Sequence, residues 1–237
     1  MAKTLILDVG NTRIKCGVFQ DDQLLEPFVF NTLEELNQKF RPADFSHVAF
    51  SSVRDFELSE AWQAITRPLN FKAQLPINIA YSVQDQPGAD RIANACYCYP
   101  ESEKSPFLII DAGTCVTYDV INTPSTFLGG AISLGLQSRL NAMHKFTGKL
   151  PLYNYAPLAG RFPYQSTREN MIGACIDGLA AEIEHYIALF SKQYSQGICV
   201  ITGGDSAALH KALKSNIFAD PNLTLKGIFN IFKYQYA

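Results

Sequence analysis

The sequence lacks the spacings typical of metal sites and disulfide scaffolds. None of its six cysteines forms a Cys-x-x-Cys pair, and most of them lie in apolar runs. We therefore expect buried free thiols in a reducing compartment. No two of its four histidines have the spacing of metal ligands on one element, so structural or surface roles are expected for them.

The sequence also lacks a large excess of positive or negative charge and long apolar runs. Charged residues make up 18% of the 237 residues, and the formal net charge is -2. This balance gives no general attraction to nucleic acid or to an anionic membrane. The apolar run at residues 5–7 ends at Asp8, far short of a secretory or membrane-spanning segment, so a cytoplasmic location is expected. With 47% hydrophobic residues the chain can bury a large core, and we expect a small molecule as its partner.

The stretch from residue 5 to residue 19 predicts a strand, a tight polar turn and a second strand. Gly10 and Asn11 suit the positive φ angles of a two-residue hairpin, and the residues after the turn alternate as in a half-buried strand. Because no helical period follows Gly10, this is not a Walker or dinucleotide loop. We expect backbone N–H groups of the turn, with the side chains of Asn11 and Thr12, to face a phosphate.

Asp8, at the end of the first strand, would lie beside that phosphate. A carboxylate and a phosphate repel each other unless a divalent cation lies between them, so Asp8 is a candidate magnesium ligand, directly or through water. Lys15 can reach a phosphate, although an exposed strand lysine is an equally good interpretation. The alternative is that Asp8 and Asn11 only stabilise an ordinary hairpin.

The opening pattern recurs a little under half a chain later. A second apolar strand ends at Asp111 and is followed by Gly113, Thr114 and an alternating strand. The proline-flanked polar stretch 100–106 precedes it and is the best linker candidate. The repetition predicts a structural duplication. The predicted lobes are residues 1–104 and 105–237.

Periodicity and capping signals predict the elements between these hairpins. A helix is expected after Thr32, with Glu35 completing a capping box. The apolar stripe of a long helix that Thr167 opens can face either the core or a partner. The other predicted elements are a strand at 47–52, helices at 55–66, 92–99 and 136–146, a strand at 198–201, a helix at 207–214 and an apolar tail at 223–234.

The two Asp-x-Gly hairpins, with the turn Thr202-Gly203-Gly204-Asp205 after a late buried strand, resemble the actin, hexokinase and Hsp70 superfamily of ATP-binding proteins. The resemblance implies an α/β fold of duplicated ribonuclease-H-like (actin-like ATPase) domains, with mixed five-stranded sheets flanked by helices. In that fold both hairpins hold the phosphates, and glycine lets the backbone approach the adenosine. The residues that the resemblance implies for ATP and its phosphates are Asp8, Val9, Gly10, Asn11, Thr12, Arg13, Ile14, Lys15, Gly113, Thr114, Gly203 and Gly204.

The motif Gly88-Ala89-Asp90-Arg91, preceded by Tyr81, narrows the resemblance to type III pantothenate kinases, over nearly the whole chain. This family phosphorylates pantothenate to 4′-phosphopantothenate with ATP, the first step of coenzyme A biosynthesis. The resemblance implies magnesium with the ATP, potassium or ammonium at Asp111, and a homodimer built partly on the long helix. It makes Asp90 the catalytic base. The residues implied for substrate binding are Tyr81, Gly88, Ala89, Arg91 and Thr167.

Residue chemistry agrees with this interpretation. A primary hydroxyl that attacks a γ-phosphate loses its proton late, so an ordinary carboxylate such as Asp90 suffices as base. Arg91 offers a planar set of donors to substrate oxygens. The alternatives are a helix cap with a surface ion pair for Asp90 and Arg91, a core aromatic for Tyr81, and an N-cap for Thr167.

One segment departs from the family pattern, and two other functions stay open. Where the family writes Gly-Gly-x-Ile-x-Pro-Gly, this chain has Leu134 in place of the proline, which puts the shape of that loop in doubt. The other functions are a phosphatase acting on polyphosphate or nucleotides, and a non-catalytic regulatory relative with the same fold. A phosphatase would release phosphate without pantothenate.

Overall fold

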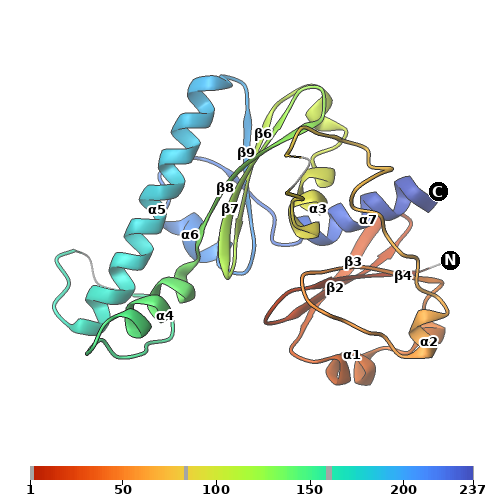
Figure 1. Cartoon of the computed structure of the whole chain (residues 1–237), viewed down its shortest axis with the longest axis horizontal. Coiled ribbons are helices and arrows are strands. Elements are labelled where there is room, and N and C mark those ends of the chain that lie inside the picture. Colours follow the sequence, from red (N-terminus) through yellow and green to blue (C-terminus); the bar gives the residue numbers. More distant parts are fainter. Residues whose placement is uncertain (1–2, 83–84, 159–161, 237) are drawn as a thin grey trace. The chain divides into compact units, whose positions relative to one another are not determined.

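The computed structural model describes residues 3–82, 85–158 and 162–236 (Figure 1). The chain divides into two compact units. Unit 1 comprises residues 1–104, 124–127 and 222–237, and unit 2 comprises residues 105–123 and 128–221. The expected boundary after residue 104 is therefore present, but the last helix belongs with the first unit and not with the second lobe.

Unit 1 contains a four-stranded sheet in the order β3-β2-β1-β4. Its first three strands form an antiparallel meander, and β4 runs parallel to β1. The strands are β1 (Thr4–Val9), β2 (Ile14–Gln20), β3 (Gln23–Phe30) and β4 (His47–Ser52). Alternating apolar residues of β1 and β2 are buried in its core, as the period of two predicts.

Helices flank this sheet, and Figure 1 shows α1 and α2 on one side of it and α3 and α7 on the other. At the start of α1 the Glu35 N–H donates to Thr32 Oγ1 (3.3 Å), which confirms Thr32 as the N-cap. The Glu35 carboxylate accepts the N–H of Asn31 (2.7 Å) instead of that of Thr32, so the predicted capping box is only half formed. The segment predicted as a helix over 55–66 contributes only the single turn α2. The elements are α1 (Leu33–Lys39), η1 (Pro42–Asp44), α2 (Glu60–Gln63), α3 (Ala89–Tyr97), η2 (Glu101–Glu103) and α7 (Leu223–Tyr236).

The final helix α7 joins unit 1 because its apolar face packs against α3 and the sheet. The rings of Phe229 and Phe19 stack with centroids 4.1 Å apart. A Cβ on Gly227 would lie 1.9 Å from the Ala93 carbonyl oxygen, so the two helices approach at backbone distance. Each fully buried large side chain at such a contact contributes about 1.5–3 kcal/mol, which is enough to place the tail.

Unit 2 repeats the strand order of unit 1. The strand order β8-β7-β6-β9 in this sheet corresponds to β3-β2-β1-β4 in unit 1. These four strands again include one parallel pair, β6 with β9. The predicted duplication is thus confirmed. The strands are β6 (Phe107–Ala112), β7 (Cys115–Asn122), β8 (Thr126–Leu134), β9 (Ile198–Thr202) and β10 (Phe218–Ala219).

The expected number of five strands in each sheet is wrong. The sheets of the described residues have four and six strands, and the sixth, β5 (Asn78–Ile79), pairs with the first two residues of β8, which are counted in unit 1. Beside β4 a fifth strand is reduced to the single parallel bridge between Val48 and Thr66. Pro68 follows two residues after Thr66, and proline lacks the N–H that a continuing ladder would need.

Three helices complete unit 2. The apolar stripe of α5 is buried in the core of this unit, so the stripe is used within the chain. No helix in the described ranges combines the length and the apolar character needed to cross a membrane. The helices are α4 (Leu136–Phe146), α5 (Thr167–Gln193) and α6 (Ser206–Ala212).

Candidate active site

The first hairpin of unit 1 has a four-residue turn at residues 10–13. The Gly10 N–H donates to the Arg13 carbonyl oxygen (3.0 Å). Neither Gly10 nor Asn11 has a positive φ, so the expected two-residue turn is wrong: the longer loop closes without a left-handed residue. The side chains of residues 11–13 are exposed and accessible to a ligand.

Asp8 occupies the end of β1 beside this turn. The strand register pairs it with Lys15 on β2 and with Ser51 on β4, so the three side chains share one face of the sheet. Ser51 is buried, and its Oγ donates to Asp8 Oδ1 (3.1 Å). A fixed carboxylate beside an ammonium group is suited to a polyphosphate that carries a divalent cation.

The substrate motif forms the start of α3. Asp90 lies in the first helical turn, and its Oδ1 accepts the Arg91 N–H (2.8 Å). A Cβ on Gly88 would lie 2.4 Å from that same oxygen. The backbone of Gly88 (φ -56°, ψ 151°) is open to any residue, so the need for glycine here is steric. Gly88 makes room for the Asp90 carboxylate.

Arg91 is buried (6% exposed), which makes the alternative of a surface ion pair wrong. Its Cζ lies 5.8 Å from the ring centroid of Tyr81 and 5.7 Å from that of Phe127. The two rings lie 6.0 Å apart and hold the guanidinium by cation–π contacts. Sequence reasoning missed Phe127, because its position beside Tyr81 depends on the pairing of β5 with β8.

A cavity of about 630 Å³ adjoins this motif within unit 1. One wall consists of residues that lead into Asp90, and the other is the segment after the Val48–Thr66 bridge, for which the sequence predicted no structure. The lining residues are Pro68, Leu69, Asn70, Phe71, Lys72, Gln86, Pro87 and Ala89.

The second hairpin, in unit 2, is one residue shorter than the first. The Gly113 N–H donates to the Cys115 carbonyl oxygen (2.9 Å). Thr114 is exposed, and its carbonyl oxygen accepts the Gly135 N–H (3.0 Å) and the Ser138 hydroxyl (2.7 Å). These bonds connect the turn to the first residues of α4.

Asp111, on β6, has a threonine opposite it on each neighbouring strand. The register pairs it with Thr117 on β7 and Thr202 on β9, so the three side chains lie on one face. In the part of the chain that the structure describes, the Oγ1 atoms of both threonines are buried without a hydrogen-bond partner. Unsatisfied oxygens beside a carboxylate are what a bound cation or water would satisfy, and these residues therefore fit a cation.

The glycine turn after β9 follows the prediction. Gly203 has φ +94°, and a Cβ there would lie 2.2 Å from the Ala112 carbonyl oxygen, so only glycine fits. The same oxygen accepts the Asp205 N–H (2.9 Å), and the Ser206 hydroxyl donates to the Gly203 carbonyl oxygen (2.7 Å). Gly204 is exposed with open space around it, so a ligand can approach its backbone.

Thr167, the remaining predicted substrate residue, is exposed at the first position of α5. The helix is capped by Ser166, whose Oγ accepts the Glu169 N–H (3.2 Å), so the interpretation of Thr167 as the N-cap is wrong. Unit 1 thus carries the first hairpin, Tyr81 and residues 88–91, and within this set Arg91 contacts Tyr81. Unit 2 carries Asp111, the second hairpin, the glycine turn and Thr167.

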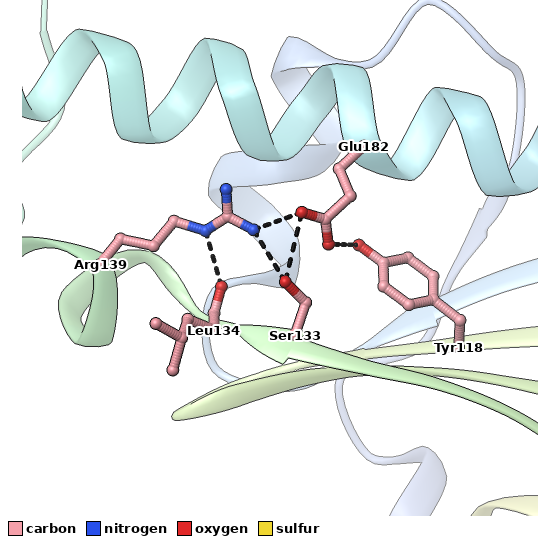
Figure 2. A network of polar contacts seen from close by, with 5 residues as sticks. All are labelled: Tyr118, Ser133, Leu134, Arg139 and Glu182. Atoms are coloured by element: carbon pink, nitrogen blue, oxygen red, sulfur yellow. Dashed lines mark hydrogen bonds and ion pairs between the residues drawn. The ribbon is translucent and has the colours of Figure 1, made fainter. Parts of the chain in front are cut away.

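Unit 2 also holds a polar network that sequence reasoning missed (Figure 2). Glu182 accepts hydrogen bonds from Tyr118 Oη (2.8 Å) and from Arg139 Nη2 (2.5 Å). Burial alone would raise the pKa of Glu182, but hydrogen bonds from Arg139, Tyr118 and Ser133 outweigh it and lower the pKa below its usual value. Arg139 Nε donates to the carbonyl oxygen of Leu134 (2.7 Å). Leu134, which replaces the proline of the family pattern, is the last residue of β8, so this bond anchors the end of a strand and not a loop.

Comparison with known proteins identifies the fold and the family. The solved structure of a conserved Campylobacter jejuni protein assigned to the Baf family superposes with a TM-score of 0.65 at 21% identity, covering 98% of both chains. The structure of the activator of 2-hydroxyisocaproyl-CoA dehydratase from Clostridium difficile, with bound ADPNP, superposes with a TM-score of 0.56 at 11% identity. The match covers 98% of this chain and 96% of that one. At these identities the likeness shows the fold, which is the expected duplicated fold of actin-like ATPases.

The sequence comparisons are more specific. The family model of the type III pantothenate kinases matches residues 4–189. Curated type III pantothenate kinases from Christiangramia forsetii and Cytophaga hutchinsonii are each 34% identical, covering 98% of this chain and 98% and 99% of theirs. The enzyme from Bacteroides fragilis is 33% identical, covering 98% of both chains. The chain therefore belongs to the type III pantothenate kinase family.

Proposed function

We propose that this protein transfers the γ-phosphoryl group of ATP to the primary hydroxyl of pantothenate, the first step of coenzyme A biosynthesis. Family membership supports the reaction. The observation that carries it in this chain is the carboxylate of Asp90, which is held at the start of α3, directly follows Ala89 of the cavity lining and has its space kept open by Gly88.

Asp90 is proposed as the catalytic base. Its Oδ1 accepts the Arg91 N–H (2.8 Å), which fixes the carboxylate and leaves Oδ2 to accept the proton of the attacking hydroxyl. Because phosphoryl transfer runs mainly on positioning and charge stabilisation, a fixed carboxylate is sufficient as the base. Arg91, Tyr81, Gly88, Ala89 and Thr167 are proposed to bind the substrate.

The remaining predicted residues are proposed to bind ATP and cations. The backbone of residues 10–13, with Lys15, would hold phosphates, as would Gly113 and Thr114 on the second hairpin, while Gly203 and Gly204 would admit the nucleoside. Magnesium, when bound through Asp8, would neutralise phosphate charge. Asp111 is proposed to bind potassium or ammonium together with the buried hydroxyls of Thr117 and Thr202.

We also propose that the protein is a cytoplasmic homodimer. The apolar stripe of α5 is core, so the subunit interface has to use another surface. One face of β8 exposes Leu128, Ile132 and Leu134 (40%, 62% and 47%), an apolar stripe of the kind found at protein interfaces. The six cysteines are free thiols, which supports a reducing compartment.

The test is a coupled ADP assay with and without pantothenate, in potassium and then in sodium. We expect ADP release that depends on pantothenate. Asp90→Asn should lower kcat by about two to four orders of magnitude, the contribution of a positioned base, with ATP binding unchanged. Asp85→Asn, a change at an exposed carboxylate just before the motif, is the matched control.

Three results would contradict the proposal. Phosphate release without pantothenate would indicate the phosphatase alternative. No release of ADP or phosphate from ATP, with or without pantothenate, would indicate a non-catalytic relative. Turnover near the wild-type rate in Asp90→Asn would remove Asp90 from the role of base.

A further inference from the structure

The last turn of α7 holds the segment 68–74 of unit 1 by side-chain hydrogen bonds. Gln235 Oε1 accepts the Asn70 N–H (3.0 Å), and Gln235 Nε2 donates to the Asn70 carbonyl oxygen (2.7 Å). The same Nε2 lies 3.4 Å from the carbonyl oxygen of Ala73 and 3.1 Å from that of Gln74. Tyr236 Oη donates to the Pro68 carbonyl oxygen (2.5 Å).

Only an amide side chain suits the position of Gln235. One end has to accept an N–H, and the other has to donate to several carbonyl oxygens at once, which a primary amide does. Glutamate at this position would direct a negative charge at those carbonyl oxygens. Leucine would leave these exposed carbonyl oxygens to water and remove the bonds that hold the segment in place.

The segment 68–74 has little structure of its own to replace these bonds. It contains no helix or strand, and its internal support is Asn70 Oδ1, which accepts the N–H groups of Lys72 (2.9 Å) and Ala73 (3.0 Å). Gln74 has φ +56°, an unfavourable conformation for a residue with a side chain. The conformation of the segment therefore depends on Gln235 and Tyr236.

The same segment forms one wall of the cavity beside the substrate motif. Pro68, Asn70 and Lys72 line it from one side, and Pro87 and Ala89, just before Asp90, from the other. We propose that Gln235 and Tyr236 are positioning residues for the acceptor: by holding residues 68–74, they fix the wall against which the phosphoryl acceptor binds. This inference rests on the proposed function.

The experiment measures KM and kcat for Gln235→Glu and Gln235→Leu, with the acceptor and ATP varied separately. Tyr234→Ala is the matched control, because Tyr234 lies on the same helical turn, is 56% exposed and has a side chain that makes no hydrogen bond with the described residues. We expect KM for pantothenate to rise about tenfold, the effect of losing well-made hydrogen bonds at the wall. KM for ATP and kcat at saturation should stay within about twofold, because the reacting groups are untouched.

Two further measurements separate positioning from a general loss of structure. Amide hydrogen exchange in residues 68–74 should quicken in both Gln235 variants and not in Tyr234→Ala, while exchange in β1 stays unchanged. Tyr236→Phe removes one hydroxyl and should raise KM for pantothenate by less than the Gln235 variants do.

The inference is overturned if the Gln235 variants keep the pantothenate KM of Tyr234→Ala. It is also overturned if both KM values and kcat change together, since that indicates a loss of fold. A wild-type protein that does not consume pantothenate overturns the proposed function instead. In that case the exchange rates still decide whether Gln235 holds the segment.

Discussion

Replacing Gly88 by alanine tests whether the placement of the Asp90 carboxylate limits the reaction. The new Cβ would lie 2.4 Å from Asp90 Oδ1, whereas ordinary contact begins at 3.4 Å. The carboxylate therefore has to move by about 1 Å and lose its bond from the Arg91 N–H. A misplacement of that size lowers rates about a hundredfold, which corresponds to about 2.7 kcal/mol of activation free energy.

The assay is steady-state turnover at saturating ATP and pantothenate. We expect kcat of Gly88→Ala to fall about a hundredfold with KM for ATP unchanged, because the displaced group is proposed to contact the acceptor and not the nucleotide. The fold should persist, since alanine can adopt φ -56° and ψ 151° and the displaced atom is the end of a side chain. Gly148→Ala is the control, because a Cβ there meets nothing within 4 Å.

A double-mutant cycle decides whether the effect acts through Asp90. If Gly88→Ala works only by moving that carboxylate, then adding it to Asp90→Asn should cause little further loss. Wild-type turnover in Gly88→Ala, or an equal further loss in the Asp90→Asn background, would refute the reasoning.

Three other predictions follow from unit 2. Glu182→Gln should lower the free energy of unfolding by about 1–2 kcal/mol, because it weakens the bonds to Arg139. The pKa of Glu182 is lowered in the folded protein, so this loss of stability should be present at neutral pH. In denaturation experiments the loss should shrink as the pH falls below about 4.5, the ordinary pKa of the group. Thr117→Val and Thr202→Val should each raise the potassium concentration needed for half-maximal activity. The free energy of unfolding should stay the same or rise by about 1 kcal/mol, because a buried unpaired hydroxyl is lost. An unchanged response of the activity to potassium would count against a cation site at Asp111. A thiol reagent should label Cys115 first, since it is the exposed cysteine, and ATP should slow the labelling; equal rates with and without ATP would argue against nucleotide at the second hairpin.

Local pattern predicted much of the fold because periodicity and capping are local properties. The strand β4 and the helix α4 have the predicted bounds, and α5 begins at Thr167 as predicted. The two hairpins were predicted from apolar runs that end at an aspartate. Where the pattern was weak, as in residues 55–66, the prediction of a helix was mostly wrong.

For the candidate site, the sequence motifs identified candidate residues. They did not show which neighbouring atoms fix the position of each side chain. The motif at residues 88–91 indicated a base and its neighbours. That Gly88 leaves space for the Asp90 carboxylate, and that Arg91 lies between two rings, depends on backbone paths that no short pattern encodes.

By itself, the sequence determined the family, the duplicated α/β pattern and the candidate residues, because hydrophobic period and motif spacing act over a few residues. Only the tertiary structure decided that α7 packs into unit 1, that Phe127 meets Arg91 and that Gln235 holds residues 68–74. These contacts join segments far apart in the chain. Their physical cause is the burial of apolar faces and the pairing of polar groups after collapse.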